Sequence, residues 1–100
     1  MIFMNLILKV KDSLEQQFPN GIKFRPDRLA NIDEAIVIRN NEIIAAYRLD
    51  NQNIVYDAQN NTIKLDSILK DRLDYPLTYH RVNYKTFNPA TIKSINDILV

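Results

Sequence analysis

The stretch that decides the fold is Val37-Ile-Arg-Asn-Asn-Glu-Ile-Ile-Ala-Ala-Tyr-Arg-Leu-Asp-Asn-Gln-Asn-Ile-Val-Tyr-Asp-Ala-Gln-Asn-Asn61, in which apolar runs alternate with asparagine-rich breaks. The chain has one glycine in 100 residues. After glycine, asparagine best tolerates the positive φ of tight hairpin turns. The asparagine breaks therefore predict turns that join neighbouring strands into an antiparallel meander. The predicted strands lie at 34–39, 42–49 and 53–58, and Asn60-Asn61 leaves a further strand at 62–65 open.

Helices are expected at both ends of the chain and in its middle. Apolar residues from Phe3 to Phe18 recur at steps of three and four, which predicts an amphipathic helix over 3–17. Asp66-Ser67 favours a helix at 67–74. Asn88-Pro89, with Asn as cap and Pro at the first helical position, favours a last helix at 89–99. Alternating residues predict two more strands, at 22–25 and 78–85.

The expected order of elements is α-β-β-β-β-(β)-α-β-α within a single domain, residues 1–100. Strands that cluster in sequence with helices around them indicate the α+β class, with a mostly antiparallel sheet of four to six strands. One hundred residues are enough to bury one core without disulfides or metals.

Composition excludes several chemistries. The chain has no cysteine, which rules out thiolate catalysis and cysteine-based zinc sites. One glycine leaves no room for a glycine-rich phosphate loop or a nucleophile elbow. The carboxylates are scattered, so neither a metal site nor a cofactor site is expected. A net charge of +1 makes no global case for nucleic acid. These features predict a protein that is not an enzyme.

The N-terminal apolar segment lacks the positive region and the small-residue cleavage site of a signal peptide. No apolar run approaches the length that spans a bilayer. We therefore expect a cytoplasmic protein without a membrane partner. The abundance of isoleucine and asparagine, which have AT-rich codons, indicates an AT-rich genome, such as that of a phage or mobile element.

Alternation in the meander carries the leading functional hypothesis. It groups most of the apolar side chains on one face, namely Ile36, Ile38, Ile43, Ala45, Tyr47, Leu49, Ile54, Tyr56 and Ala58. The second face has an apolar centre within a charged rim, formed by Ala35, Val37, Ile44, Ala46 and Val55 with Arg39, Glu42, Arg48 and Asp57. A solvated face would be polar throughout, so this face needs a cover. One of the chain's own helices, a second copy of the chain, or a different protein would each serve.

We therefore predict a small non-catalytic protein-binding module: an adaptor, an inhibitor or an assembly factor. Its partner is another protein or a second copy of itself, in which case it forms a homodimer. The predicted partner-binding residues lie on the second face and at its rim: Val37, Ile44, Ala46, Val55, Arg39 and Arg48.

Two alternatives rest on the segment 78–85. Alternation places Tyr79, Arg81, Asn83 and Lys85 on one side, where aromatic and cationic groups suit a single-stranded nucleic acid; an ordinary exposed strand face has the same pattern. The only histidine, His80, falls on the opposite side and is expected to be half-buried. A more distant alternative makes His80 the general acid or base of a small ribonuclease.

Overall fold

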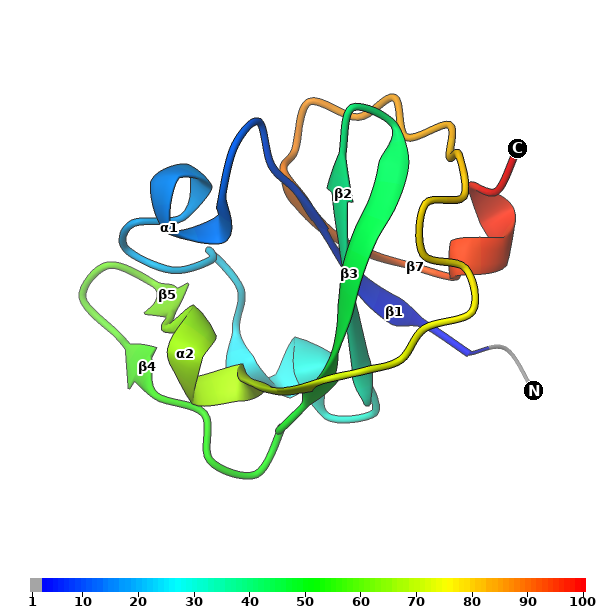
Figure 1. Ribbon diagram of the computed structural model, residues 1–100. Helices are drawn as coiled ribbons and strands as arrows, with labels where there is room; N and C mark the ends of the chain where they lie inside the picture. The colour runs from blue at the N-terminus through cyan, green and yellow to red at the C-terminus, as the bar shows by residue number, and fades with distance from the viewer. Residues whose placement is uncertain (1–2) are drawn as a thin grey trace.

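A five-stranded sheet organises the chain in the computed structural model, which describes residues 3–100 (Figure 1). In spatial order its strands are β6 (Leu69–Arg72), β3 (Glu42–Leu49), β2 (Glu34–Arg39), β1 (Asn5–Lys9) and β7 (Ala90–Lys93). Strand β1 pairs in parallel with β2, and all other neighbours pair antiparallel. The predicted α+β class with a mostly antiparallel sheet is confirmed.

Short elements fill the connections between these strands. They are α1 (Leu14–Gln17), η1 (Pro26–Leu29), the strand pair β4 (Tyr56–Asp57) and β5 (Thr62–Ile63), α2 (Leu65–Ile68) and η2 (Ile95–Asp97). Each helix is about one turn long, so the sheet supplies the framework. Within residues 3–100 no helix has the length and hydrophobicity needed to cross a membrane.

The hairpin of β2 and β3 lies at the residues that its sequence predicts. Its two-residue loop is Asn40-Asn41, with φ angles of 53° and 61°. Two consecutive left-handed residues form the turn whose twist matches that of the flanking strands. Asn61, with φ of 56°, has the same backbone conformation between β4 and β5. Asparagine thus does take the place of glycine in these turns.

A β-bulge in this hairpin changes which side chains share a face. Val37 pairs with Ala45 but Ile38 pairs with Ile43, so Ile44 is an extra residue on β3. An extra residue shifts the alternation by one position. The predicted faces of β3 are wrong for this reason, because strict alternation puts Ile44 with Ala46. In the structure Ile44 packs on the same side as Val37 and Ala45, and Ala46 packs on the opposite side.

The predicted N-terminal helix over 3–17 is wrong, since residues 5–9 form the interior strand β1, between β2 and β7. Residues 6–8 are fully buried because side chains pack against β1 from both faces of the sheet. A strand covered on both faces has a continuous apolar run, which the spacing of a short segment cannot distinguish from a helix. Only α1 remains of the helix. It begins after Ser13, whose hydroxyl oxygen accepts the N–H of Gln16.

The predicted C-terminal helix over 89–99 is also wrong. Asn88 caps no helix; its side-chain oxygen accepts the backbone N–H of Ala90, the first residue of strand β7. The β-branched residues Thr91 and Ile92 then continue in the extended strand β7, which pairs with β1. The chain turns into a single 3-10 turn, η2, only after this strand.

The remaining predicted elements survive as shorter pieces. The second half of the predicted helix 67–74 is β6, which completes the sheet by pairing with β3. The predicted strand 53–58 is reduced to β4, which pairs with β5 and leaves the main sheet. The predicted strands 22–25 and 78–85 are reduced to isolated bridges, at Ile22, Arg81 and Val82. The observed order is therefore β-α-β-β-β-β-α-β-β, and the predicted order is wrong.

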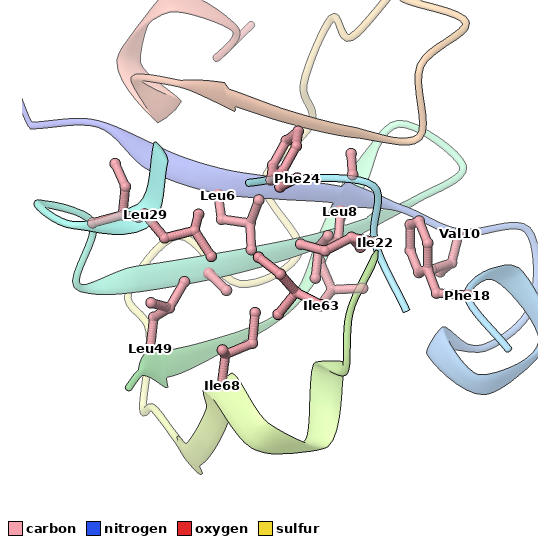
Figure 2. Close-up of a cluster of buried hydrophobic side chains, with 14 of the residues drawn as sticks. Leu6, Leu8, Val10, Phe18, Ile22, Phe24, Leu29, Leu49, Ile63 and Ile68 are labelled. Carbon is pink, nitrogen blue, oxygen red and sulfur yellow. The ribbon is translucent and has the colours of Figure 1, made fainter. Parts of the chain in front are cut away.

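The chain itself covers both faces of the sheet. The α1 face is the one covered by residues 14–32, β5 and α2, and Figure 2 shows Leu6 and Leu8 packed there against Ile63. The η2 face is the one covered by residues 73–84 and η2, where Val82 and Ile95 contact the sheet. In Figure 1 α1 and α2 lie on one side of β3 and η2 lies on the other. Loops and single-turn helices, rather than a long helix, provide the cover.

Candidate functional site

The predicted partner-binding residues do not form one surface. Val37 is 2% exposed on the α1 face, and Ala46 is fully buried on the η2 face. Val55 is 50% exposed and precedes β4, outside the main sheet. Arg48 is exposed and its Nε donates to Asp71 Oδ2 at 3.1 Å. Only Arg39 and Ile44 reach a common surface feature, together with the buried Val37.

That feature is an open hollow of about 320 Å³ on the α1 face beside residues 44–47 of β3. We call it the β3 hollow. Its apolar lining comes from Val10, Leu14, Val37, Ile44 and Ala45. Its polar lining comes from Asp12, Ser13, Arg39, Tyr47, Arg72 and Tyr79. The β-bulge contributes directly, because it places Ile44, Ala45 and Tyr47 on one side of β3.

Two arginines at the β3 hollow are held by backbone carbonyls. Arg39, the last residue of β2, donates from Nη1 to the carbonyl of Asp12 at 3.2 Å. Arg72, the last residue of β6, donates from Nη2 to the carbonyl of Ile44 at 3.3 Å. Within residues 3–100 neither guanidinium has a carboxylate oxygen within 4.0 Å. Each guanidinium carries five N–H donors, so each has donors left for a ligand.

Arg72 fills a gap in the pairing along the outer edge of β3. On one side of this gap the Leu73 N–H bonds to the Ala46 carbonyl at 2.8 Å. On the other side the Tyr79 N–H bonds to the Ile43 carbonyl at 2.6 Å. Between these two points the chain leaves β3, and the Arg72 side chain donates to the backbone carbonyl of Ile44, which lies in the gap. The arginine is thereby directed along the rim of the hollow.

Tyr79 reaches the hollow by an unusual backbone conformation. Its φ is 71°, in the left-handed region that bulky residues rarely adopt. It belongs to the segment that covers the η2 face, yet it lines the hollow on the α1 face. The segment therefore passes around the edge of β3 at this residue. Tyr79 is 71% exposed.

The predicted nucleic-acid stripe is divided by this turn. Arg81, Asn83 and Lys85 are exposed and alternate with buried neighbours, as predicted, but Tyr79 is directed to the β3 hollow instead. His80 is exposed rather than half-buried, because the left-handed residue before it interrupts the alternation. Its backbone carbonyl accepts the Ile43 N–H at 3.0 Å.

A second hollow of about 890 Å³ lies between α1 and the β4–β5 pair, and its lining has mixed charge. The carboxylate of Asp57 in this lining is already used locally. It accepts from the side chain and backbone N–H of Asn60 and from the backbone N–H of Gln59. These hydrogen bonds, with that to the Asn60 side chain foremost, lower the pKa of Asp57 below its usual value. We therefore infer that the Asp57 carboxylate serves to hold its own turn together.

Metal binding finds no support in the described part of the chain. Between residues 3 and 100 no three histidine, aspartate or glutamate side chains are grouped so that they could hold an ion. The β3 hollow contains a single carboxylate, that of Asp12. Its chemistry is that of two cations and two phenol rings around an aliphatic floor.

Among the arginines and tyrosines of the site, sequence reasoning missed two, Tyr47 and Arg72. Arg72 falls within the predicted helix 67–74, and strict alternation puts Tyr47 on the face opposite Val37. A bulge is hard to predict from a run such as Glu42-Ile-Ile-Ala-Ala46, in which every apolar residue suits either face.

Comparisons of the chain with protein-family models, with curated proteins and with solved structures found no match.

Proposed function

We propose that this protein is a small non-catalytic protein-binding module and that the β3 hollow is its anchoring site. The observation that carries the proposal is the pair of arginines, Arg39 and Arg72, that line the hollow above its aliphatic floor and have no carboxylate partner within residues 3–100. Arginine and tyrosine are enriched among the residues that dominate binding energy at protein interfaces. The hollow combines both residue types with apolar surface, at a size suited to one or two side chains of a partner.

The broad apolar sheet face of the sequence hypothesis is replaced by this smaller site. Of the predicted partner-binding residues, Arg39 and Ile44 keep their role, and the side chain of Val37 supports the floor from within the core. An adaptor, an inhibitor and an assembly factor would each use such a site. All three would recognise a partner segment without catalysing a reaction.

A display library of random peptides tests this proposal. The immobilised protein is used for selection, and the dissociation constants of enriched peptides are measured by fluorescence anisotropy. Replacing Arg39 and Arg72 together by alanine should weaken binding by about 10- to 100-fold, since charge-assisted hydrogen bonds are removed. The matched control replaces Arg81 and Lys85 by alanine, which removes the same charge elsewhere and should leave binding within about twofold. Failure to enrich any peptide, or equal weakening by both double variants, would refute the proposal.

A second candidate function is binding of single-stranded nucleic acid. The supporting observation is the exposed series Arg81, Asn83 and Lys85 on the segment that also carries the exposed Tyr79. Labelled poly-dT and poly-U oligonucleotides at low salt are the probes. Here the roles of the variants are exchanged: replacing Arg81 and Lys85 should lower the slope of log affinity against log salt by about 0.7 for each phosphate that is no longer neutralised. No binding at low salt would eliminate this candidate.

A further inference from the structure

The identity of the residue at position 79 is the strongest clue to what occupies the β3 hollow. Five positions in residues 3–100 have positive φ, and four of them carry the residues that suit it: Gly21, Asn40, Asn41 and Asn61. Tyr79 is the exception. A bulky side chain is strained in this conformation, and asparagine or glycine would largely remove the strain. Since the chain uses asparagine freely at such positions, the ring of Tyr79 needs a reason beyond the backbone.

The place of the ring supplies such a reason. Tyr79 is highly exposed, so its ring contributes little to the core. It lines the hollow together with Arg39 and Arg72, and Tyr47 lies opposite Arg72 in the strand register. An exposed aromatic ring next to unpaired guanidinium groups can stack on a second ring while the guanidiniums hold an anion.

The charge of the hollow limits which anion fits. Two guanidiniums and the carboxylate of Asp12 leave it with one net positive charge. A single carboxylate balances this charge, and its two oxygens match the donor geometry of a guanidinium. A nucleic-acid strand would need further cations along its path. The cations of the predicted nucleic-acid stripe, Arg81 and Lys85, do not line the hollow and belong to the segment over the η2 face.

We propose that the β3 hollow recognises a partner segment in which an acidic residue adjoins an aromatic one, and that Tyr79 determines this specificity. The carboxylate lies between Arg39 and Arg72, and the aromatic ring stacks on Tyr79 above the aliphatic floor. This inference rests on the proposed protein-binding function and names the chemistry of the partner.

The first test compares binding and stability at position 79. Tyr79→Asn should raise the thermal midpoint by about 2–5 °C by relieving the backbone, and should weaken binding of Phe-Glu peptides by about tenfold. Tyr79→Phe keeps the ring and should change neither property by much. A purely structural tyrosine would instead lower the midpoint in the asparagine variant. Either a lower midpoint or unchanged binding would overturn the specificity role.

The second test uses the acetylated and amidated peptide Gly-Ser-Phe-Glu-Ser-Gly in a nuclear magnetic resonance titration. We expect shifts at the amides of Arg39, Ile44, Tyr47, Arg72 and Tyr79, with binding at least about tenfold weaker when Gln replaces Glu or Ala replaces Phe. Equal binding of the Glu and Gln peptides, or tighter binding of poly-dT at this hollow, would overturn the inference. Library peptides that bind here without Asp or Glu would refute this inference and leave the protein-binding function standing. A library that yields no binder refutes that function.

Discussion

At the scale of single residues, Gly21 is a position where a side chain has no room. Its φ is 89°, and a Cβ built there would lie 2.1 Å from the carbonyl oxygen of Ile63. The backbone of Ile63 cannot easily move, because it exchanges two hydrogen bonds with Ile22, at 2.9 and 2.8 Å. The only glycine of the chain is therefore required by a close approach between two backbones.

We predict that Gly21→Ala lowers the free energy of unfolding by about 3 kcal/mol or more, through the clash and the strained φ together. Urea denaturation measures the change. Asn40→Gly is the control, because a glycine at a left-handed turn position removes no buried side chain. A midpoint for Gly21→Ala that equals the parent's would mean that the Gly21–Ile63 approach is not as close as described.

Tyr84 makes stability depend on alkaline pH. Burial raises the pKa of Tyr84 to about 12, and its hydroxyl donates to the carbonyl of Asn88 at 2.9 Å. Between pH 10 and about 12 the unfolded chain loses this proton and the folded chain keeps it, so stability falls as the pH rises. Burial and the charge of Glu34 also raise the pKa of Tyr75, which adds to the fall.

Tyr84→Phe should therefore cost about 1 kcal/mol at pH 8, where the missing hydrogen bond dominates. The difference between parent and variant should shrink as the pH rises through 10, because the variant has one ionisation fewer. Urea midpoints across this range measure it, and tyrosinate absorbance of the folded protein reports the pKa. A constant difference at all pH values would contradict the assignment.

At the scale of elements, what the sequence predicts well is what neighbouring residues decide. The β2–β3 hairpin depends on Asn40-Asn41 and on strand-forming residues at both sides, all within one short segment. The strand β1 depends on partners far along the chain, since β2 and β7 flank it and both faces are covered. Its apolar run suits a helix until those partners are known.

The candidate site likewise depends on contacts that neighbouring residues do not decide. The sequence predicts Arg39 and Ile44 as partner-binding residues and Tyr79 as a nucleic-acid-binding residue, on two different surfaces. Two irregularities unite them: the bulge at Ile44 and the left-handed residue at position 79. Neither leaves a signal in single-sequence periodicity, because a bulge changes no residue type and tyrosine is not expected at positive φ. The site could not be assembled from the sequence for that reason.

The hairpin turn offers a test of the asparagine interpretation. Asn41→Ala should lower the free energy of unfolding by about 1 kcal/mol, because alanine tolerates φ of 61° poorly. Asn41→Gly should stay within about 0.5 kcal/mol of the parent, since glycine adopts this conformation without strain. Thermal unfolding followed by circular dichroism separates the two. Similar losses in both variants would mean that the side chain of Asn41, rather than its backbone, matters.

At the scale of the whole molecule, the sheet is packed on both sides. The open sheet face predicted as an interface is therefore covered by the chain itself. The outer edge of β3 is paired with β6 and bridged to Arg81. The edge strands β6 and β7 have no outer strand partner within residues 3–100, but both are short, and in β7 Pro89 precedes the strand and Lys93 ends it. Such features discourage edge-to-edge pairing. We expect a monomer at micromolar concentration by light scattering.

Two glutamate substitutions distinguish internal cover from an external partner. Val37→Glu places a charge in the core of the α1 face and should lower the free energy of unfolding by about 4 kcal/mol or more, a large share of the stability of a domain this size. Ile44→Glu lies at the half-buried floor of the β3 hollow, so its charge reaches water. The Ile44→Glu protein should fold and lose peptide binding, because the new carboxylate neutralises the neighbouring arginines.

Circular dichroism and fluorescence anisotropy on both variants measure these outcomes. A folded Val37→Glu protein that lost only its association would restore the open sheet face as the interface, since a side chain that tolerates a charge is not in the core.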